Sequence, residues 1–179
     1  MLPDRVIHIA GGPARVEPEL WRFLGVTAED PVPEILPAGP IAVPLAAWKG
    51  RRADFLARRE PVGVWLAPAD DPVELASDLD TLALVAIQFP KFTDGRGYST
   101  AVLLRTRLGY RGELRAFGDV GRDQLFYLKR SGFDAFSLAP HRDPESALAS
   151  LADFSVRYQG SVDDPLPLFR RRQATGAAK

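Results

Sequence analysis

The residues best suited to chemistry gather in one short segment, residues 88–98, with the sequence QFPKFTDGRGY. The segment combines Lys91, Asp94 and Arg96 with two glycines. It lies between an apolar run that predicts a buried strand and the start of a predicted helix. Backbone amides at a helix amino terminus attract anions, and glycines allow a ligand to approach them closely. The segment therefore predicts a site for sulfate, sulfite, phosphate or a carboxylate.

Three further polar residues follow the next two predicted strands, namely Asp119, Arg122 and His141. The carboxyl ends of parallel strands meet at one edge of a sheet, so we expect these residues near segment 88–98. A carboxylate and an imidazole placed there could also move a proton. The alternative interpretation is structural, because Asp94 and Asp119 both precede predicted helices and aspartate is a favoured helix cap.

Several chemistries are absent from the sequence. The chain contains no cysteine, which excludes a thiolate nucleophile, a disulfide and cysteine ligands for zinc or iron–sulfur clusters. Its two histidines, His8 and His141, are far apart, so we predict no metal site. No motif for flavin, nicotinamide or haem is recognisable, and we predict no cofactor. The residues alone leave open whether the protein is an enzyme.

The balance of charge argues against nucleic acids and membranes as partners. Lys plus Arg total 23 and Asp plus Glu total 23, which gives a formal net charge of +0. Binding to nucleic acid or to a membrane surface needs clustered positive charge. No stretch reaches the roughly eighteen apolar residues of a membrane-spanning helix, and the first residues do not resemble a signal peptide. We therefore expect a cytoplasmic protein.

Alternating strand and helix patterns predict an α/β fold. From residue 61 onward, apolar runs typical of buried strands alternate four times with helical patterns. Four consecutive βα units predict a mainly parallel sheet. We expect an open sheet with helices on both faces, and half of a β/α barrel is the alternative. The predicted strands are 62–67, 82–89, 113–117 and 133–138, and the predicted helices are 72–79, 98–108, 121–130 and 144–154.

The length of 179 residues is that of a single domain with a proper core. Residues 1–60 are irregular and rich in proline, which predicts short edge strands packed on the same domain, because proline cannot donate to a central ladder. Residues 61–158 form the predicted βα core, and residues 159–179 a flexible tail. An alternative for the tail is docking on a partner through its apolar residues Leu166, Leu168 and Phe169.

Three stretches carry a resemblance to a known family. They are FPKFTDGRGYS at 89–99, LGYRGELRAFGDVGRDQLFYLKRSGFDAF at 108–136 and DFSVRYQ at 153–159. Together and in this order they are similar to a bacterial family described as oxidoreductases or as proteins involved in sulfite reduction. The resemblance implies a place beside sulfite reductase in sulfur assimilation. It implies no catalytic residues, and no redox motif in this chain supports the oxidoreductase description.

These observations lead to three hypotheses. The first is an accessory protein of assimilatory sulfate and sulfite reduction, which binds or supports sulfite reductase or another enzyme of the pathway. The second is an enzyme or sensor for a small anion. The third is a structural module in which exposed strand edges of the N-terminal part pair between copies, giving a homo-oligomer. The predicted ligand-binding residues for the second hypothesis are Lys91, Asp94, Arg96, Asp119, Arg122 and His141.

Overall fold

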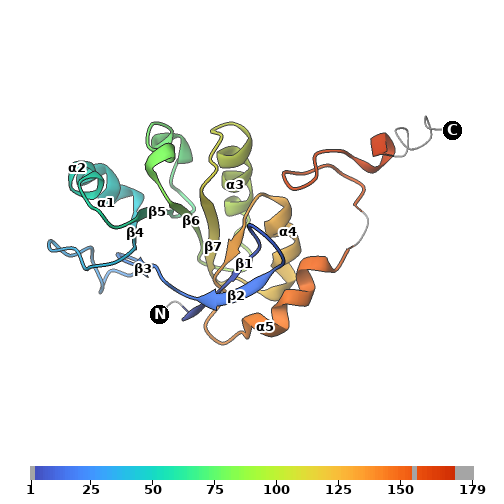
Figure 1. Cartoon of the computed structure of the whole chain (residues 1–179), viewed down its shortest axis with the longest axis horizontal. Coiled ribbons are helices and arrows are strands. Elements are labelled where there is room, and N and C mark those ends of the chain that lie inside the picture. Colours follow the sequence, from blue (N-terminus) through green and yellow to red (C-terminus); the bar gives the residue numbers. More distant parts are fainter. Residues whose placement is uncertain (1–2, 155–156, 172–179) are drawn as a thin grey trace.

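A mixed eight-stranded sheet organises the computed structural model, which describes residues 3–154 and 157–171 (Figure 1). The strands follow the order β2-β1-β8-β7-β6-β5-β4-β3. They are β1 (Arg5–His8), β2 (Arg15–Pro18), β3 (Arg22–Phe23), β4 (Ile41–Pro44), β5 (Val62–Leu66), β6 (Leu84–Phe89), β7 (Glu113–Gly118) and β8 (Ala135–Phe136).

Helices and 3₁₀ turns connect most of these strands. The α-helices are α1 (Leu45–Gly50), α2 (Arg52–Leu56), α3 (Arg96–Thr106), α4 (Leu125–Arg130) and α5 (Pro144–Ala147). The 3₁₀ helices are η1 (Pro72–Leu75), η2 (Leu79–Thr81), η3 (Arg122–Gln124) and η4 (Leu148–Ala152).

The sheet confirms the α/β class but corrects its expected topology. Strands β3 to β8 pair in parallel in chain order, whereas β1 pairs antiparallel with both β8 and β2. The sheet is therefore mixed and curls into a half-barrel, so the mainly parallel open sheet was wrong. Apolar runs indicate where strands lie but not their direction. No local sequence pattern indicates that β1 pairs antiparallel with β8.

The prediction of four regular βα units is also not confirmed. The chain after β5 forms the two short 3₁₀ helices η1 and η2 where the pattern predicted one short helix over 72–79. Asp71 caps η1, since its carboxylate accepts the Val73 N–H at 2.9 Å. The carboxylate of Asp78 turns inward to Trp48 and Arg52, and the chain turns there instead of continuing as an α-helix. The predicted helix over 144–154 divides into α5 and η4.

The proline-rich N-terminal part supplies both edges of the sheet. Strands β2 and β3 lie at its two ends, as predicted for strands from this part. Strand β1 lies inside the sheet, between β2 and β8, although it comes from the same part. Strand β4 also lies inside the sheet, between β3 and β5. Its proline, Pro44, occupies the last position of the strand, where the helix α1 begins. The preceding residues of β4 therefore remain able to donate to the ladder.

Side chains alternate between two faces of the sheet, and each face has its own core. The outer face packs on the helices, and the core between them includes Phe89 of β6 with Leu104 of α3 and Leu125 of α4. The inner face, opposite the helices, carries a smaller cluster made only of residues outside the helices. That cluster consists of Phe23, Ala42, Trp65, Leu84, Ala86 and Phe117, with Trp21, Val26 and Ala67 packed against it. The inner face of the half-barrel thus carries an apolar cluster that no helix of the described residues joins.

The segment 157–171 returns to the end of α4. The Arg130 carbonyl accepts the Val162 N–H at 3.1 Å, and the Arg130 guanidinium donates to the Gln159 carbonyl at 2.6 Å. Leu166 and Phe169 remain more than half exposed. The division into 1–60, 61–158 and a flexible tail stays a prediction, and residues 172–179 of that tail lie outside the described residues.

Candidate functional site

The charged residues of the loop after β6 pair with each other. The Arg96 guanidinium donates to both carboxylate oxygens of Asp94, at 3.0 and 2.7 Å. This contact lowers the pKa of Asp94 and raises the pKa of Arg96. Asp94 also accepts the backbone N–H of Arg96 at 3.3 Å, which uses an amide at the start of α3. Little of the charge of Arg96 is therefore left for an added anion.

Asp119 fastens the same loop to the end of β7. Its carboxylate accepts the Phe92 N–H at 2.9 Å, and its own N–H donates to the Phe89 carbonyl at 2.7 Å. Asp119 does not cap the following helix, because Gly121 occupies that position and its N–H donates to the Gln124 side chain. The carboxylate thus has a structural partner in the loop that the sequence identified.

The remaining predicted residues are exposed side chains around the loops that follow the strands. Lys91, Arg122 and His141 make no side-chain hydrogen bond or ion pair within the described part of the chain. The structure therefore joins Asp94 to Arg96, and links Asp119 to the same loop through the Phe92 amide. Whether the six residues bind a ligand stays a prediction.

A hollow of about 770 Å³ opens on the inner face of the half-barrel, at a place that the sequence did not indicate. Trp21, Phe23 and Phe117 form its aromatic walls, and the rings of Phe23 and Phe117 are 4.9 Å apart between centroids. We call this hollow the inner pocket. Its other lining residues are Pro3, Asp4, Glu19, Arg22, Val26, Thr27, Asp30, Gln88, Gly118 and Pro140.

Two parts of the chain build the inner pocket. Gln88, Phe117 and Gly118 come from the carboxyl ends of β6 and β7, which is where β/α barrels place their ligands. The opposite wall comes from residues 19–30. There the Trp21 N–H donates to the Glu19 carboxylate at 2.8 Å, which fixes the chain beside the indole.

A buried ion-pair cluster lies beside the inner pocket. Arg115 stands in the same cross-strand row as Ala86 and Trp65, so its side chain belongs to the inner face. Its guanidinium lies 2.5 Å from a carboxylate oxygen of Glu19 and 2.5 Å from one of Glu113. Arg115 is 1% exposed, and a charge so buried needs such partners. A second hollow, of about 300 Å³, touches this cluster and shares Trp21 with the inner pocket.

Comparison with known proteins gives a family but no activity. The model of a family described as "Bacterial protein of unknown function (DUF934)" matches residues 63–169. The chain belongs to this family. No curated protein and no solved structure matches the chain. The DUF934 description carries no link to sulfite reduction or to redox chemistry, so both stay predictions.

The DUF934 match divides the inner pocket unevenly. Gln88, Phe117 and Gly118 lie within the matched residues 63–169. The wall formed by residues 19–30 lies before them, together with Pro3 and Asp4. The residues matched by the family model therefore form the part of the sheet below the pocket. Much of the surface that would contact a ligand comes from the N-terminal part, before the match.

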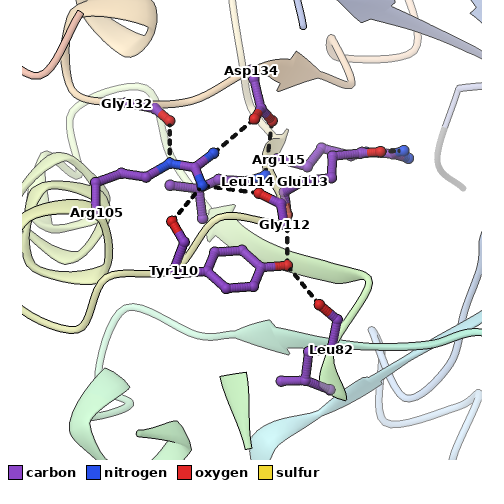
Figure 2. A network of polar contacts seen from close by, with 9 residues as sticks. All are labelled: Leu82, Arg105, Tyr110, Gly112, Glu113, Leu114, Arg115, Gly132 and Asp134. Carbon is purple, nitrogen blue, oxygen red and sulfur yellow. Dashed lines mark hydrogen bonds and ion pairs between the residues drawn. The ribbon is translucent and has the colours of Figure 1, made fainter. Parts of the chain in front are cut away.

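Residues of the second stretch that carried the resemblance, 108–136, join Arg105 in a structural network at the other end of the strands (Figure 2). Arg105 on α3 donates to the carbonyls of Tyr110, Gly112 and Gly132 and to the carboxylate of Asp134. Asp134 also accepts the N–H of Leu114 at 2.8 Å. Burial raises the pKa of Asp134, although Arg105 acts in the opposite direction. The network joins α3 to β7 and to the loop before β8.

The hydroxyl of Tyr110 extends this network toward β6 (Figure 2). It lies 3.2 Å from the Leu82 carbonyl and 3.1 Å from the Glu113 carbonyl. Burial raises the pKa of Tyr110, so this phenol stays protonated and able to donate. Because Leu82 and Glu113 stand at the amino ends of their strands, this network is remote from the inner pocket along the strands and serves to hold them in register.

Two negative findings concern the described residues, 3–154 and 157–171. No three His, Asp or Glu side chains there group as metal ligands do. No helix in residues 3–154 and 157–171 is long and apolar enough to cross a membrane.

Proposed function

We propose that this DUF934 protein is a binding protein that holds a small organic molecule in the inner pocket. The observation that carries this proposal is a hollow of about 770 Å³ whose aromatic walls are combined with a few polar groups. Ligand pockets in proteins have this size and this mixture of groups. The position at the carboxyl ends of β6 and β7 supports it further, because β/α folds bind their ligands at that end of the strands.

Gln88 gives the inner pocket a group for orienting such a ligand. Its side-chain amide offers both donors and an acceptor, and within the described residues it has no hydrogen-bond partner of its own. Phe117 stands beside it on the neighbouring strand, since Gln88 and Phe117 are partners in the β6–β7 register. A molecule bound in the pocket beside these strands could therefore direct a polar edge to the Gln88 amide.

The small-anion hypothesis has weaker support in the geometry. Its strongest cation, Arg96, is compensated by Asp94, and Asp119 brings a second carboxylate to the same loop. Carboxylates near an anion site lower its affinity. Lys91 and Arg122 would have to supply the attraction, and both are exposed. We therefore place the ligand in the inner pocket.

An accessory role in sulfite reduction, in the cytoplasm, is a second proposal. It rests on the resemblance of the three family strings, and an exposed aromatic surface supports it. Tyr127 on α4 is 54% exposed and Phe154 is 51% exposed, and both pack against Phe126. Exposed aromatic side chains are frequent at protein interfaces, so this surface could contact sulfite reductase or a neighbouring enzyme.

Growth of a deletion strain tests the accessory role. The strain would be supplied with sulfate, sulfite or sulfide as sole sulfur source. Growth on sulfide but not on sulfite supports the role, and normal growth on all three contradicts it. Complementation with the Tyr127→Ala variant, compared with the Thr27→Trp variant described next, separates the aromatic surface from the inner pocket.

Dye binding tests the pocket. The probe is N-phenyl-1-naphthylamine, an uncharged dye whose fluorescence rises in apolar surroundings. We expect one dye molecule to bind per chain. Thr27 lines the mouth of the pocket and its side chain makes no hydrogen bond, so Thr27→Trp fills the space without disturbing the fold. This variant should weaken dye binding by at least about tenfold, or about 1.4 kcal/mol.

The matched control is Ser99→Trp. Ser99 lies on α3 beside a shallow hollow of about 360 Å³ on the other face of the sheet. This variant should bind the dye as the wild type does. If the wild type fails to bind the dye, or if Thr27→Trp binds it unchanged, the inner pocket is not the binding site.

A further inference from the structure

The charges around the inner pocket indicate what its ligand carries. We propose that the pocket selects organic cations, that is, molecules with an apolar or aromatic body and a positively charged nitrogen. This inference rests on the proposed binding function and specifies the ligand class.

Carboxylates outnumber cations around the inner pocket. Asp4, Glu19 and Asp30 line it, and Arg22 is the cation among the lining residues. Arg115 lies behind Glu19 and contacts Glu113 as well, so its single charge compensates two carboxylates only in part. The whole chain, in contrast, has 23 basic and 23 acidic residues. A concave site with an excess of one sign of charge concentrates ligands of the opposite sign.

Two of these carboxylates are free to meet a ligand. The side chains of Asp4 and Asp30 make no hydrogen bond or ion pair with any residue that the structure describes. Both are exposed at the mouth of the pocket, where they can turn toward a bound molecule. Glu19, by contrast, is held by Arg115 and the Trp21 N–H, so it supplies a fixed negative charge at the wall.

The aromatic walls favour the same ligand class. A cation near the face of an aromatic ring, within about 6 Å of its centroid, is attracted by the electron density of that face. Trp21 is the half-buried ring of the wall, and tryptophan is the strongest of these partners, whereas Phe23 and Phe117 are 8% and 1% exposed and pack on each other. Anions are repelled by both the ring faces and the carboxylates, and uncharged molecules gain only from apolar burial.

Arg22 is the feature that would favour an anion instead. It lines the pocket, it is exposed, and in the described part of the chain its side chain has no partner. This single exposed guanidinium lines the same pocket as the two free carboxylates of Asp4 and Asp30. We therefore expect Arg22 to weaken cation binding without reversing the preference.

Competition for the dye tests the preference for cations. Choline carries a quaternary nitrogen, and 3,3-dimethylbutan-1-ol has nearly the same shape with carbon in place of that nitrogen. Choline should displace N-phenyl-1-naphthylamine at concentrations at least about tenfold lower than the alcohol requires. Benzenesulfonate, an aromatic anion, should displace it poorly. Equal displacement by choline and the alcohol, or stronger displacement by the sulfonate, overturns the preference while the dye-binding function stands.

Charge variants add a test that damage to the fold could not imitate. Asp30→Asn should lower the apparent affinity for choline roughly three- to tenfold and leave the alcohol unaffected. Arg22→Gln should raise the affinity for choline. Glu29→Gln is the control, because Glu29 is exposed beside Asp30 but does not line the pocket. An unchanged affinity in Asp30→Asn, or a loss of affinity in Arg22→Gln, contradicts the assignment of a cation site.

Discussion

Arg115 and Glu19 form an ion pair with 2.5 Å between Nη1 and Oε2, although 96 positions separate them along the chain. Their side chains are 2% and 9% exposed, so the pair is shielded from water. Electrostatic attraction between two charges is stronger in such a buried place than in water. Arg115 belongs to β7, and Glu19 lies two residues before the Trp21 wall of the inner pocket. The pair therefore fastens the N-terminal wall of the pocket to the centre of the sheet.

Removing the guanidinium of Arg115 should destabilise the protein strongly. In Arg115→Met the carboxylates of Glu19 and Glu113 stay buried close together without their shared cation, which costs about 3–5 kcal/mol. Urea unfolding followed by circular dichroism measures the loss. Arg22→Met is the control, since this exposed arginine has no partner among the described residues and should change stability by less than about 0.5 kcal/mol. Equal losses in the two variants would contradict the role of the pair.

Substitution of the two glycines at the start of α3 by alanine should change the stability of the protein to different extents. A Cβ at Gly97 would lie 2.5 Å from the ring of Phe89 and 3.0 Å from Ile87, both in the outer core. Gly97→Ala should therefore cost about 1–3 kcal/mol through overpacking. A Cβ at Gly95 would come no closer than 3.9 Å to Tyr98, so Gly95→Ala should be nearly neutral. Thermal unfolding of both variants decides the point, and a neutral Gly97→Ala would contradict the close packing.

Asp78 should make part of the stability depend on pH. Its carboxylate binds the Arg52 guanidinium and the Trp48 indole N–H, and the Arg52 contact, more than the Trp48 one, lowers its pKa below the usual 3.8. A lowered folded-state pKa contributes stability above about pH 4, and that contribution is lost as the pH falls through the folded value. Asp78→Asn should cost about 2 kcal/mol at pH 7 and progressively less below pH 4.

The control for this measurement is Asp80→Asn. Asp80 is exposed, and its side chain makes no hydrogen bond within the described residues. Urea unfolding at a series of pH values would compare both variants with the wild type. The difference in free energy of unfolding between Asp78→Asn and the wild type should shrink from pH 7 to pH 3. If it stayed constant, the Arg52 contact would not be what lowers the pKa of Asp78.

Variants of Asp119 and Lys91 test whether the loop after β6 has a structural role or binds an anion. Asp119→Ala removes the acceptor of the Phe92 N–H and should cost about 1 kcal/mol, with faster amide hydrogen exchange in the loop. Lys91→Ala should leave stability unchanged, and millimolar phosphate should raise the melting temperature of neither the wild type nor this variant. If phosphate stabilised the wild type and Lys91→Ala abolished the effect, the anion hypothesis would be restored.

Local patterns allowed a correct prediction of the central strands. The apolar runs around Val62, Leu84 and Leu114 are long enough and continuous enough to indicate strands covered on both faces. The antiparallel pairing of Ile7 with Phe136 was not predictable, because no local sequence pattern around either residue indicates which strand it pairs with. The mixed character of the sheet follows from that one long-range contact, so the expected topology failed there.

The inner pocket was missed for a related reason. Its walls meet only when the segment containing Trp21 folds over β7, a contact between parts of the chain that were interpreted as separate regions. One signal was present in the strand ELRAF, where Arg115 stands among apolar residues on the same side as Glu113 and Phe117. A charge in the middle of a buried strand needs partners, and here they come from its own strand and from Glu19.

The pairing of β1 with β8 sets the order in which the protein can be completed during translation. The ribosome releases β1 and β2 first, but the strand that β1 joins emerges only after nearly all of the domain. A lone two-stranded hairpin is marginally stable, and its open edge is prone to mispairing. The newly made hairpin therefore has no sheet to join until Phe136 has left the exit tunnel.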